Sequence, residues 1–397
     1  MEDKNKIAMK RGDNNDFKCA HAKKCGSCKY INSTYESQCK AKEEYLTRLL
    51  KPFVTPEPFI KCVEPMFYRN KVHAVFGEGK GRTVIAGTYE EGTHRIVPID
   101  KCLIENEKAD EILGTIKELL PSFKIRPYDE DKGTGLLRHV LIRRGYRTGE
   151  ILVVLVIVDP VFPSKNNFVK ALLKKHPEIS TIVLNINDKK TGMVLGERQK
   201  VIYGKGYITD ELLGKRFSIG AGTFYQINSL QCEKLYLKAF EFLKPKKQDV
   251  VIDAYCGIGT IGICLASKVK EVYGVELNEE SVKNAGKNAK ANNVTNVKFY
   301  ANDAGRFMTD LAVKGKTVDA VITDPPRSGL TKEFKDAIIK MAPQKLVYIS
   351  CNPVTLAADL KDLKKGGYSV KRAVGFDMFP WTDGIETCAL LTKASEA

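Results

Sequence analysis

Long apolar runs are absent from this 397-residue sequence. No stretch reaches the roughly eighteen apolar residues of a membrane span, so we expect no membrane association. The longest apolar stretch, residues 151–158, has the length of a buried strand. Residues 1–16 are charged and polar and lack the apolar core of a secretory signal. We therefore expect a cytoplasmic protein with a disordered tail at residues 1–16.

Acidic residues are outnumbered, with 48 Asp and Glu against 64 Lys and Arg, which gives a net charge of +16. Most of this excess lies in residues 1–220. A basic surface concentrates phosphate backbones near it, so nucleic acid is a candidate partner, although charge alone does not decide the matter. The hydrophobic fraction of 43% is sufficient for a packed core, and the length allows two or three domains.

Two patterns of predicted elements divide the chain into residues 17–220 and 221–397. The first part mixes strands and helices irregularly, which is typical of an α+β domain. In the second part short apolar strands alternate with helices, the rhythm of a doubly wound, Rossmann-like α/β sheet. The strands expected there are 250–255, 271–276, 297–301, 320–323 and 346–350, followed by 368–374 and 387–392.

Glycines and acidic residues near the first two of these strands predict a cofactor site. Gly257-x-Gly259-x-x-Gly262 follows the first strand, and Glu276 ends the second, where a carboxylate can bind ribose hydroxyls. These features fit any nucleoside cofactor, including a nicotinamide. Asp324-Pro-Pro after the fourth strand resembles the corresponding motif of S-adenosylmethionine methyltransferases, so it favours that cofactor.

Cys351 follows the fifth strand, at the sheet edge where open α/β sheets place ligands. Carbon 5 of uracil is a poor nucleophile, but adding a thiolate to carbon 6 gives an enolate that can attack a sulfonium methyl. A base must then remove the carbon 5 proton so that the thiolate can leave. Cys351 and Glu386 could supply these two groups. A single strand-end cysteine is more often structural, so this reading depends on the neighbouring motifs.

Four segments carry a resemblance to a known family: Asp324-Pro-Pro-Arg327, Ser350-Cys-Asn-Pro353, Asp377-Met-Phe-Pro380 followed by Glu386, and Phe224-Tyr-Gln-Ile-Asn228. Together they resemble the RNA 5-methyluridine (uracil-5) methyltransferase family. The resemblance implies that Cys351 is the nucleophile and Glu386 the proton-abstracting base. It also implies that S-adenosylmethionine contacts four residues, Gln226, Tyr255, Glu276 and Asp324. Trp381 and Gly384 stand where the family commonly has histidines.

The eleven cysteines of a cytosolic chain are not expected to form disulfides. Cys19, Cys25 and Cys28 are spaced as ligands of zinc or of an iron–sulfur cluster, whereas His21 between them is expected to be solvated. The fourth ligand is open among Cys39, Cys62 and Cys102.

The rRNA branch of the resembled family carries a [4Fe–4S] cluster with three close cysteines and one distant cysteine. That resemblance favours Cys102 as the fourth ligand, with zinc as the alternative metal. It makes 23S rRNA the preferred substrate and transfer RNA a second one. We expect residues 17–220 to bind RNA without the small β-barrel that many members carry at the start. Tyr68-Arg69-Asn70-Lys71, Arg138 and Arg143-Arg144 are the candidate RNA contacts.

Three other functions compete with this interpretation. A methyltransferase acting on an exocyclic amine of a nucleic acid would not need Cys351. An rRNA-binding assembly factor without activity would not need Cys351 and Glu386 together. A nicotinamide oxidoreductase leaves the Asp-Pro-Pro and Ser-Cys-Asn-Pro motifs unexplained. We expect a monomer without an obligate protein partner.

Overall fold

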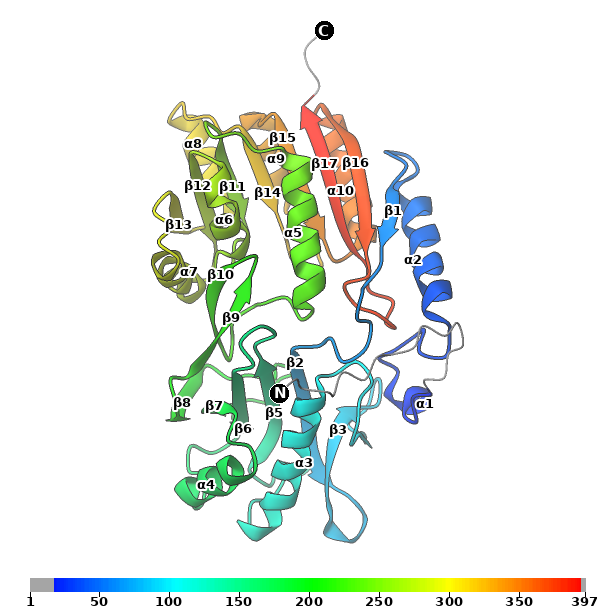
Figure 1. Ribbon diagram of the computed structural model, residues 1–397, viewed down its shortest axis with the longest axis vertical. Helices are drawn as coiled ribbons and strands as arrows, with labels where there is room; N and C mark the ends of the chain where they lie inside the picture. The colour runs from blue at the N-terminus through cyan, green and yellow to red at the C-terminus, as the bar shows by residue number, and fades with distance from the viewer. Residues whose placement is uncertain (1–17, 394–397) are drawn as a thin grey trace, which may run out of the picture.

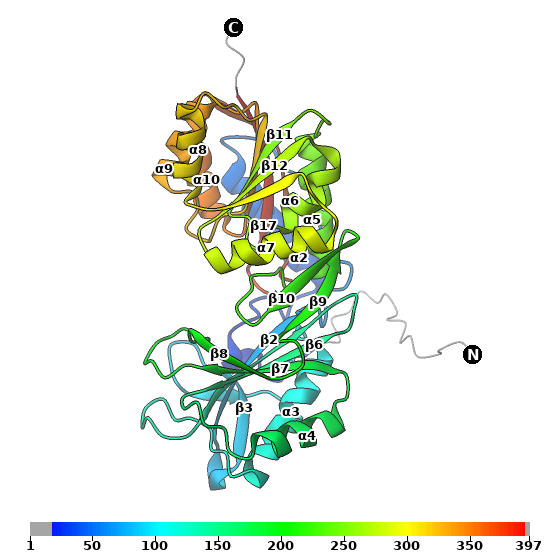
Figure 2. The same cartoon turned by 90° about the vertical axis from the view of Figure 1, so that its left-hand side faces the viewer.

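The computed structural model describes residues 18–393, which form two β-sheet regions stacked along the long axis (Figure 1). One region is built on an eight-stranded sheet and the other on a seven-stranded sheet, and a two-stranded hairpin reaches from one to the other (Figure 2). The predicted tail at residues 1–16 lies outside the described residues. Among residues 18–393, no helix is long and apolar enough to cross a membrane.

The large sheet has the order β1-β16-β17-β15-β14-β11-β12-β13. The five neighbouring strands β15, β14, β11, β12 and β13 are parallel to one another. β17 is antiparallel to both β15 and β16. Since β12 and β14 lie on opposite sides of β11, the direction of chain progression reverses there, and the carboxyl ends of these strands border a crevice. The strands are β1 (Glu57–Ile60), β11 (Val250–Ala254), β12 (Glu271–Glu276), β13 (Val297–Ala301), β14 (Ala320–Thr323), β15 (Lys345–Ser350), β16 (Tyr368–Phe376) and β17 (Glu386–Lys393).

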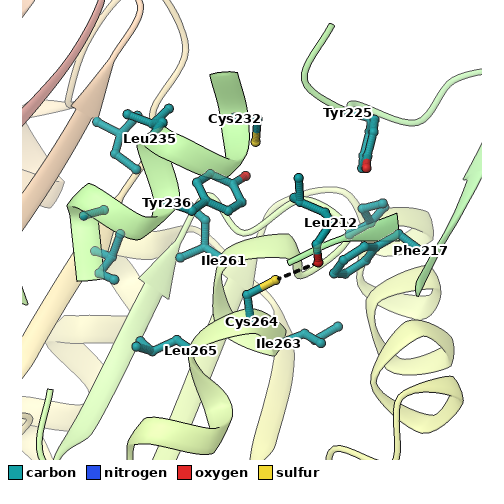
Figure 3. Packing of buried hydrophobic residues seen from close by; sticks show 14 of the residues in the cluster. Leu212, Phe217, Tyr225, Cys232, Leu235, Tyr236, Ile261, Ile263, Cys264 and Leu265 are labelled. Atoms are coloured by element: carbon teal, nitrogen blue, oxygen red, sulfur yellow. Dashed lines mark hydrogen bonds between the residues drawn. The ribbon is translucent and has the colours of Figure 1, made fainter. Parts of the chain in front are cut away.

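Helices cover both faces of this sheet, each over its own apolar core. One face packs against α5 (Ser229–Leu243), α6 (Thr260–Leu265) and α7 (Glu279–Ala291). Figure 3 shows this core, in which Tyr236 of α5 lies beside Ile261 of α6. The other face packs against α8 (Ala304–Val313), α9 (Lys332–Met341) and α10 (Pro353–Lys365). The predicted doubly wound, Rossmann-like α/β sheet is therefore confirmed.

Two elements from the N-terminal part of the chain also belong to the large sheet region. β1 pairs in parallel with β16 at the sheet edge (Figure 1). α2 (Tyr35–Leu50) places Leu46 and Leu50 in the same core as the apolar residues of α10. The hairpin of β9 (Tyr207–Leu212) and β10 (Lys215–Gly220) contributes Phe217 to the opposite core. These elements cross the expected boundary at residue 220, because the large sheet recruits segments that are distant in sequence.

The smaller sheet has the order β4-β3-β2-β5-β6-β7-β8 and is buried on both faces at its centre. In β6, Val153 and Leu155 face the helices, whereas Leu152 and Val154 pack into the core shared with the β9–β10 hairpin. This double burial explains why residues 151–157 are continuously apolar. The elements are β2 (Lys71–Glu78), β3 (Val84–Tyr89), β4 (Ile96–Pro98), β5 (Leu137–Arg144), β6 (Ile151–Ile157), β7 (Ile179–Ile186), β8 (Arg198–Tyr203), α3 (Glu107–Ser122) and α4 (Lys165–Lys175); the short α1 (Ala22–Cys25) precedes them.

Candidate active site

A cavity of about 660 Å³ opens at the carboxyl ends of β11, β12, β14 and β15. Residues from the entrance to α5, from the β16–β17 loop and from the start of β17 complete its wall. All six residues predicted for catalysis and cofactor binding line it: Gln226, Tyr255, Glu276, Asp324, Cys351 and Glu386. The structure thus gathers side chains that are up to 160 residues apart (386 − 226) at one edge of the sheet.

Strand pairing brings Cys351 and Glu386 together. In the antiparallel pair of β15 and β17, Ile349 lies opposite Cys388 and Ser350 lies opposite Thr387. Cys351 directly follows Ser350 and Glu386 directly precedes Thr387, so the two residues lie at the same end of this strand pair. Both residues line the cavity, so the thiol and the carboxyl group can act on the same bound base.

The sequence around Cys351 holds it in a sharp strand-to-helix turn. Asn352 caps α10, because its side chain accepts a hydrogen bond from the Val354 amide at 3.1 Å, and Pro353 is favourable in the first helical turn. The side-chain amide of Asn352 also donates a hydrogen bond to the backbone carbonyl of Arg327 at 3.0 Å. This bond ties the turn that carries Cys351 to the segment that follows Asp324.

The glycine-rich segment after β11 is shaped by two carboxylates. The amide of Gly262 donates to Asp253 at 2.8 Å, and the amide of Gly257 donates to Glu276 at 3.2 Å. Gly259 has a φ of 81°, and an added Cβ would lie 2.7 Å from the Phe299 ring. At Gly257 no described atom lies within 4 Å of such a Cβ, so the backbone there is open to the cavity.

The cavity gathers acidic groups around the thiol. Burial and the nearby Asp324 raise the pKa of Glu386 well above its usual value, and burial also raises the pKa of Asp324. The pKa of Cys351 is raised to about 11 by burial, with Glu386 and Asp324 adding to the effect. Arg327 is the cation that lowers the pKa values of both Cys351 and Glu386. It therefore favours the thiolate that the reaction needs.

Replacing Arg327 with glutamine is expected to move the alkaline-rising limb of kcat/KM to higher pH. Cys351 reacts only as the thiolate, and loss of the guanidinium raises its pKa further, so the thiolate fraction at neutral pH falls. A shift of one pKa unit would lower the rate at neutral pH by about tenfold. The profile of kcat/KM between neutral and alkaline pH measures it. An unchanged limb with a uniformly lower rate would assign Arg327 to substrate binding alone.

The two departures from the family pattern have structural consequences. Gly384 lies against Phe379, and an added Cβ would be 2.8 Å from the nearest ring carbon, so a histidine there requires Phe379 to move. Trp381 has a left-handed backbone with φ of 69° and is only 3% exposed. Its indole donates to the Pro65 carbonyl at 2.9 Å, so it packs against the N-terminal part of the chain and is not among the residues lining the cavity.

The four predicted metal ligands, Cys19, Cys25, Cys28 and Cys102, line a second cavity of about 600 Å³. Burial and the other two nearby thiols raise the pKa of Cys28 to about 12, while Arg69 lowers it. Within residues 18–393, however, no three histidine, cysteine, aspartate or glutamate side chains are arranged to hold a metal ion. The donor types therefore fit a thiolate-bound group, whereas the sulfur atoms of the described residues are not close enough together to hold one metal ion.

The alternative fourth ligands are placed elsewhere. Cys39 is buried beside Asp377, and the thiol of Cys62 lies 3.4 Å from the side-chain amide of Asn228. Neither lines the cavity of the other cysteines. His21, which the sequence predicts to be solvated, is half-buried and also lines this cavity.

Several predicted RNA contacts are buried instead. Tyr68 donates to the Pro380 carbonyl, and Asn70 donates to the Gln226 carbonyl at 2.9 Å, so both join the two sheet regions. Arg138 is 4% exposed and ion-paired with Glu130. Arg143 is 3% exposed and donates to the Thr223 carbonyl. These predictions were wrong, because the sequence alone does not distinguish a polar or basic side chain that contacts RNA from a buried one that donates to a carbonyl group or pairs with a carboxylate.

Some residues of the active-site cavity were not predicted. Arg327 and Phe379 lie inside the quoted motifs, so their positions were available, but no chemistry was assigned to them. Phe224, which is 70% exposed at the cavity, was noted only as part of a motif. Thr331 and Asn302 carry no local signal, since they reach the cavity only through the packing of the loops.

The parallel sheet with its crevice, the carboxylate-shaped glycine loop and Asp-Pro-Pro after β14 define an S-adenosylmethionine-dependent methyltransferase. The family model described as tRNA (uracil-5-)-methyltransferase matches residues 34–394. The chain therefore belongs to the tRNA (uracil-5-)-methyltransferase family, and the predicted enzyme class is confirmed.

Relatives and a solved structure agree with this assignment. An RNA methyltransferase of Halalkalibacterium halodurans is 40% identical over 378 residues, covering 94% of this chain and 82% of the relative. One of Caldanaerobacter subterraneus subsp. tengcongensis is 40% identical over 379 residues, covering 94% and 84%. The Pyrococcus abyssi tRNA (uracil-54, C5)-methyltransferase in complex with S-adenosyl-L-homocysteine is 29% identical, with a TM-score of 0.76 over 90% of this chain and 84% of that one.

Proposed function

We propose that the enzyme methylates carbon 5 of a uridine in RNA through a covalent bond between Cys351 and carbon 6 of the base. The observation that supports this proposal is that Cys351 and Glu386 line the same cavity as Asp324 and Glu276. An exocyclic-amine methyltransferase would need neither the thiol nor a base on the adjacent strand.

The residues of the chain divide the chemistry between them. The thiolate of Cys351 adds to carbon 6, and carbon 5 thereby becomes nucleophilic and takes up the methyl group. Glu386 then removes the carbon 5 proton, the electron pair of that C–H bond re-forms the C5–C6 double bond, and the sulfur of Cys351 leaves. S-adenosylmethionine supplies the methyl group when bound, and Gln226, Tyr255, Glu276 and Asp324 are the residues that would hold it.

Ribosomal RNA, specifically 23S rRNA, is our first candidate substrate, and transfer RNA is the second. The cavity lined by four cysteines supports 23S rRNA as the substrate, because the rRNA branch of the family carries a cluster held by four cysteines. The family description and the tRNA-specific Pyrococcus abyssi enzyme support the second. Either target base must be turned out of its stack to reach the cavity.

Methyl transfer from labelled S-adenosylmethionine to unmodified 23S rRNA and to unmodified transfer RNA tests both points. We expect 5-methyluridine after nucleoside digestion of 23S rRNA. Label confined to transfer RNA would replace the rRNA assignment while leaving the chemistry intact. A different methylated nucleoside would reject the uracil-5 reaction in this enzyme.

We further propose that Cys19, Cys25, Cys28 and Cys102 hold a [4Fe–4S] cluster, with zinc as the alternative. The common cavity of the four thiols and the nearby positive charge of Arg69 support a thiolate-bound, negatively charged group. Ile227 lines both this cavity and the active-site cavity, so the two adjoin. The group would order the N-terminal segment and needs no part in the methyl transfer.

Replacing Cys102 with serine is expected to remove iron and acid-labile sulfide from anaerobically purified protein and to lower its thermal midpoint. The reason is that a four-ligand site loses its distant anchor, and folding is coupled to metal binding. Cys62→Ser is the matched control, because Cys62 lies outside the cavity. Zinc without sulfide in the wild type would select the alternative metal, and iron retained by Cys102→Ser would exclude Cys102 as a ligand.

A further inference from the structure

The segment that leads into Glu386 is a loop, residues 377–385, between β16 and β17. Phe376 and Glu386, the last and first residues of these strands, pair with each other at its base. The loop carries Phe379, whose side chain lines the active-site cavity together with Glu386. The position of this loop therefore affects both a wall of the cavity and the strand end that bears the base.

A fully buried ion pair anchors the first residue of the loop. Lys42 of α2 is 1% exposed and Asp377 is 0% exposed, and the Lys42 ammonium lies 2.7 Å from one oxygen of the Asp377 carboxylate. The other oxygen accepts hydrogen bonds from Tyr35 at 2.8 Å and Gln38 at 2.9 Å. All three donors come from α2, about 340 residues earlier in the chain.

The same N-terminal elements also bind the backbone of the loop. Lys42 donates a second hydrogen bond to the Phe379 carbonyl at 3.0 Å, and the Gln38 side chain accepts one from the Trp381 amide at 2.9 Å. The Trp381 carbonyl accepts from the Tyr30 amide at 2.8 Å. Because Trp381 is held in a left-handed conformation that costs a non-glycine residue energy, the loop needs such contacts to keep its shape.

The Oε1 atom of Glu386 does not fix the orientation of its side chain. Glu386 is 1% exposed, and its Oε1 atom has no hydrogen-bond partner among residues 18–393. Its placement depends on the backbone of β17 and of the loop before it. The apolar contacts of Leu46 and Leu50 already attach α2 to the core, so the ion pair is not required simply to dock the helix.

We propose that Lys42 and Asp377 are positioning residues for the proton-abstraction step: their buried ion pair holds the 377–385 loop so that Glu386 meets the carbon 5 proton. This proposal rests on the proposed role of Glu386 as the base. The step affected is specific: the C5–H bond breaks toward Glu386, the C5–C6 double bond re-forms and the C6–S bond to Cys351 breaks. Addition of the thiolate and uptake of the methyl group precede it.

The double variant Lys42→Met/Asp377→Asn tests the proposal, because it removes the ion pair without leaving a single buried charge. The substrate is RNA tritiated at carbon 5 of uridine, so tritium release reports proton abstraction separately from methyl uptake. We expect release to slow by about ten- to a hundredfold, as for a small misplacement of a catalytic group. The methylated enzyme–RNA adduct should accumulate on a denaturing gel, with KM for S-adenosylmethionine unchanged.

Lys40→Met/Glu44→Gln is the matched control, since it removes an exposed pair from the same helix and should leave tritium release unchanged. Trp381 is the only tryptophan, so its emission should shift to longer wavelength in the test variant and not in the control. Release that keeps pace with methyl uptake in the folded double variant would overturn the proposal.

Lys42→Arg, which keeps both charges but alters the geometry, gives a second test if the double variant does not fold. Lys42→Arg should also slow tritium release. If Lys42→Arg releases tritium at the wild-type rate, or if neither variant folds, the ion pair serves the fold alone. Absence of 5-methyluridine with the wild-type enzyme would instead reject the underlying reaction, which distinguishes the two failures.

Discussion

Replacing Cys351 with alanine is expected to abolish formation of 5-methyluridine, with a rate below about 10⁻⁴ of the wild type. Without the thiolate, carbon 5 is not activated, and no other described thiol lines the cavity. Binding of S-adenosylmethionine should persist, because the residues proposed to hold it belong to other segments of the chain than β15 and α10. Single-turnover methyl transfer and calorimetric cofactor titration measure the two effects separately.

Cys388→Ala is the matched control for this experiment. Cys388 lies two residues after Glu386 but is buried in the core and does not line the cavity. Its removal should reduce stability by about 1 kcal/mol, as small core truncations do, and leave the covalent adduct intact. Undiminished methylation by Cys351→Ala would remove the covalent mechanism and return the exocyclic-amine reaction to consideration.

The parallel strands of the large sheet could be predicted because each is a short apolar run bounded by turn residues. The expected range 271–276 agrees with β12, and 320–323 agrees with β14. The cavity residues could be assigned to the same sheet edge for the same reason, since carboxyl ends of parallel strands meet there. The meeting of Cys351 and Glu386 in one cavity could not be predicted in this way, because the antiparallel insertion of β17 between β15 and β16 is a property of the whole sheet.

Elements whose partners are distant in sequence escaped prediction. β1 has only four residues and is stabilised as a strand by pairing with β16, more than 300 residues later. The exposed β8 lacks alternation of buried and exposed side chains, so it carries no strand signal of its own. Lys42 and Asp377 illustrate the same limit for charges, because nothing in either local sequence distinguishes a buried ion pair from two solvated side chains.

Replacing Glu386 with glutamine is expected to trap the enzyme on its RNA. The amide cannot accept the carbon 5 proton, so methyl uptake can occur while release of the Cys351 sulfur is slowed by about 10²–10⁴-fold. The variant should give a methyl-labelled enzyme–RNA complex that survives denaturation, whereas Cys351→Ala/Glu386→Gln should give none. The amount of complex and the rate of tritium release from carbon 5 measure the effect.

Asp383→Asn supplies the control for Glu386→Gln, because Asp383 is an exposed acidic residue of the same loop that does not line the cavity. It should turn over normally and accumulate no complex. A Glu386→Gln enzyme that releases tritium at the wild-type rate would transfer the role of the base to another group, and Asp324 is then the carboxylate to examine, since it lines the same cavity. Trapping by Glu386→Gln would instead require the thiol and this carboxyl group to act on the same base, as their common cavity predicts.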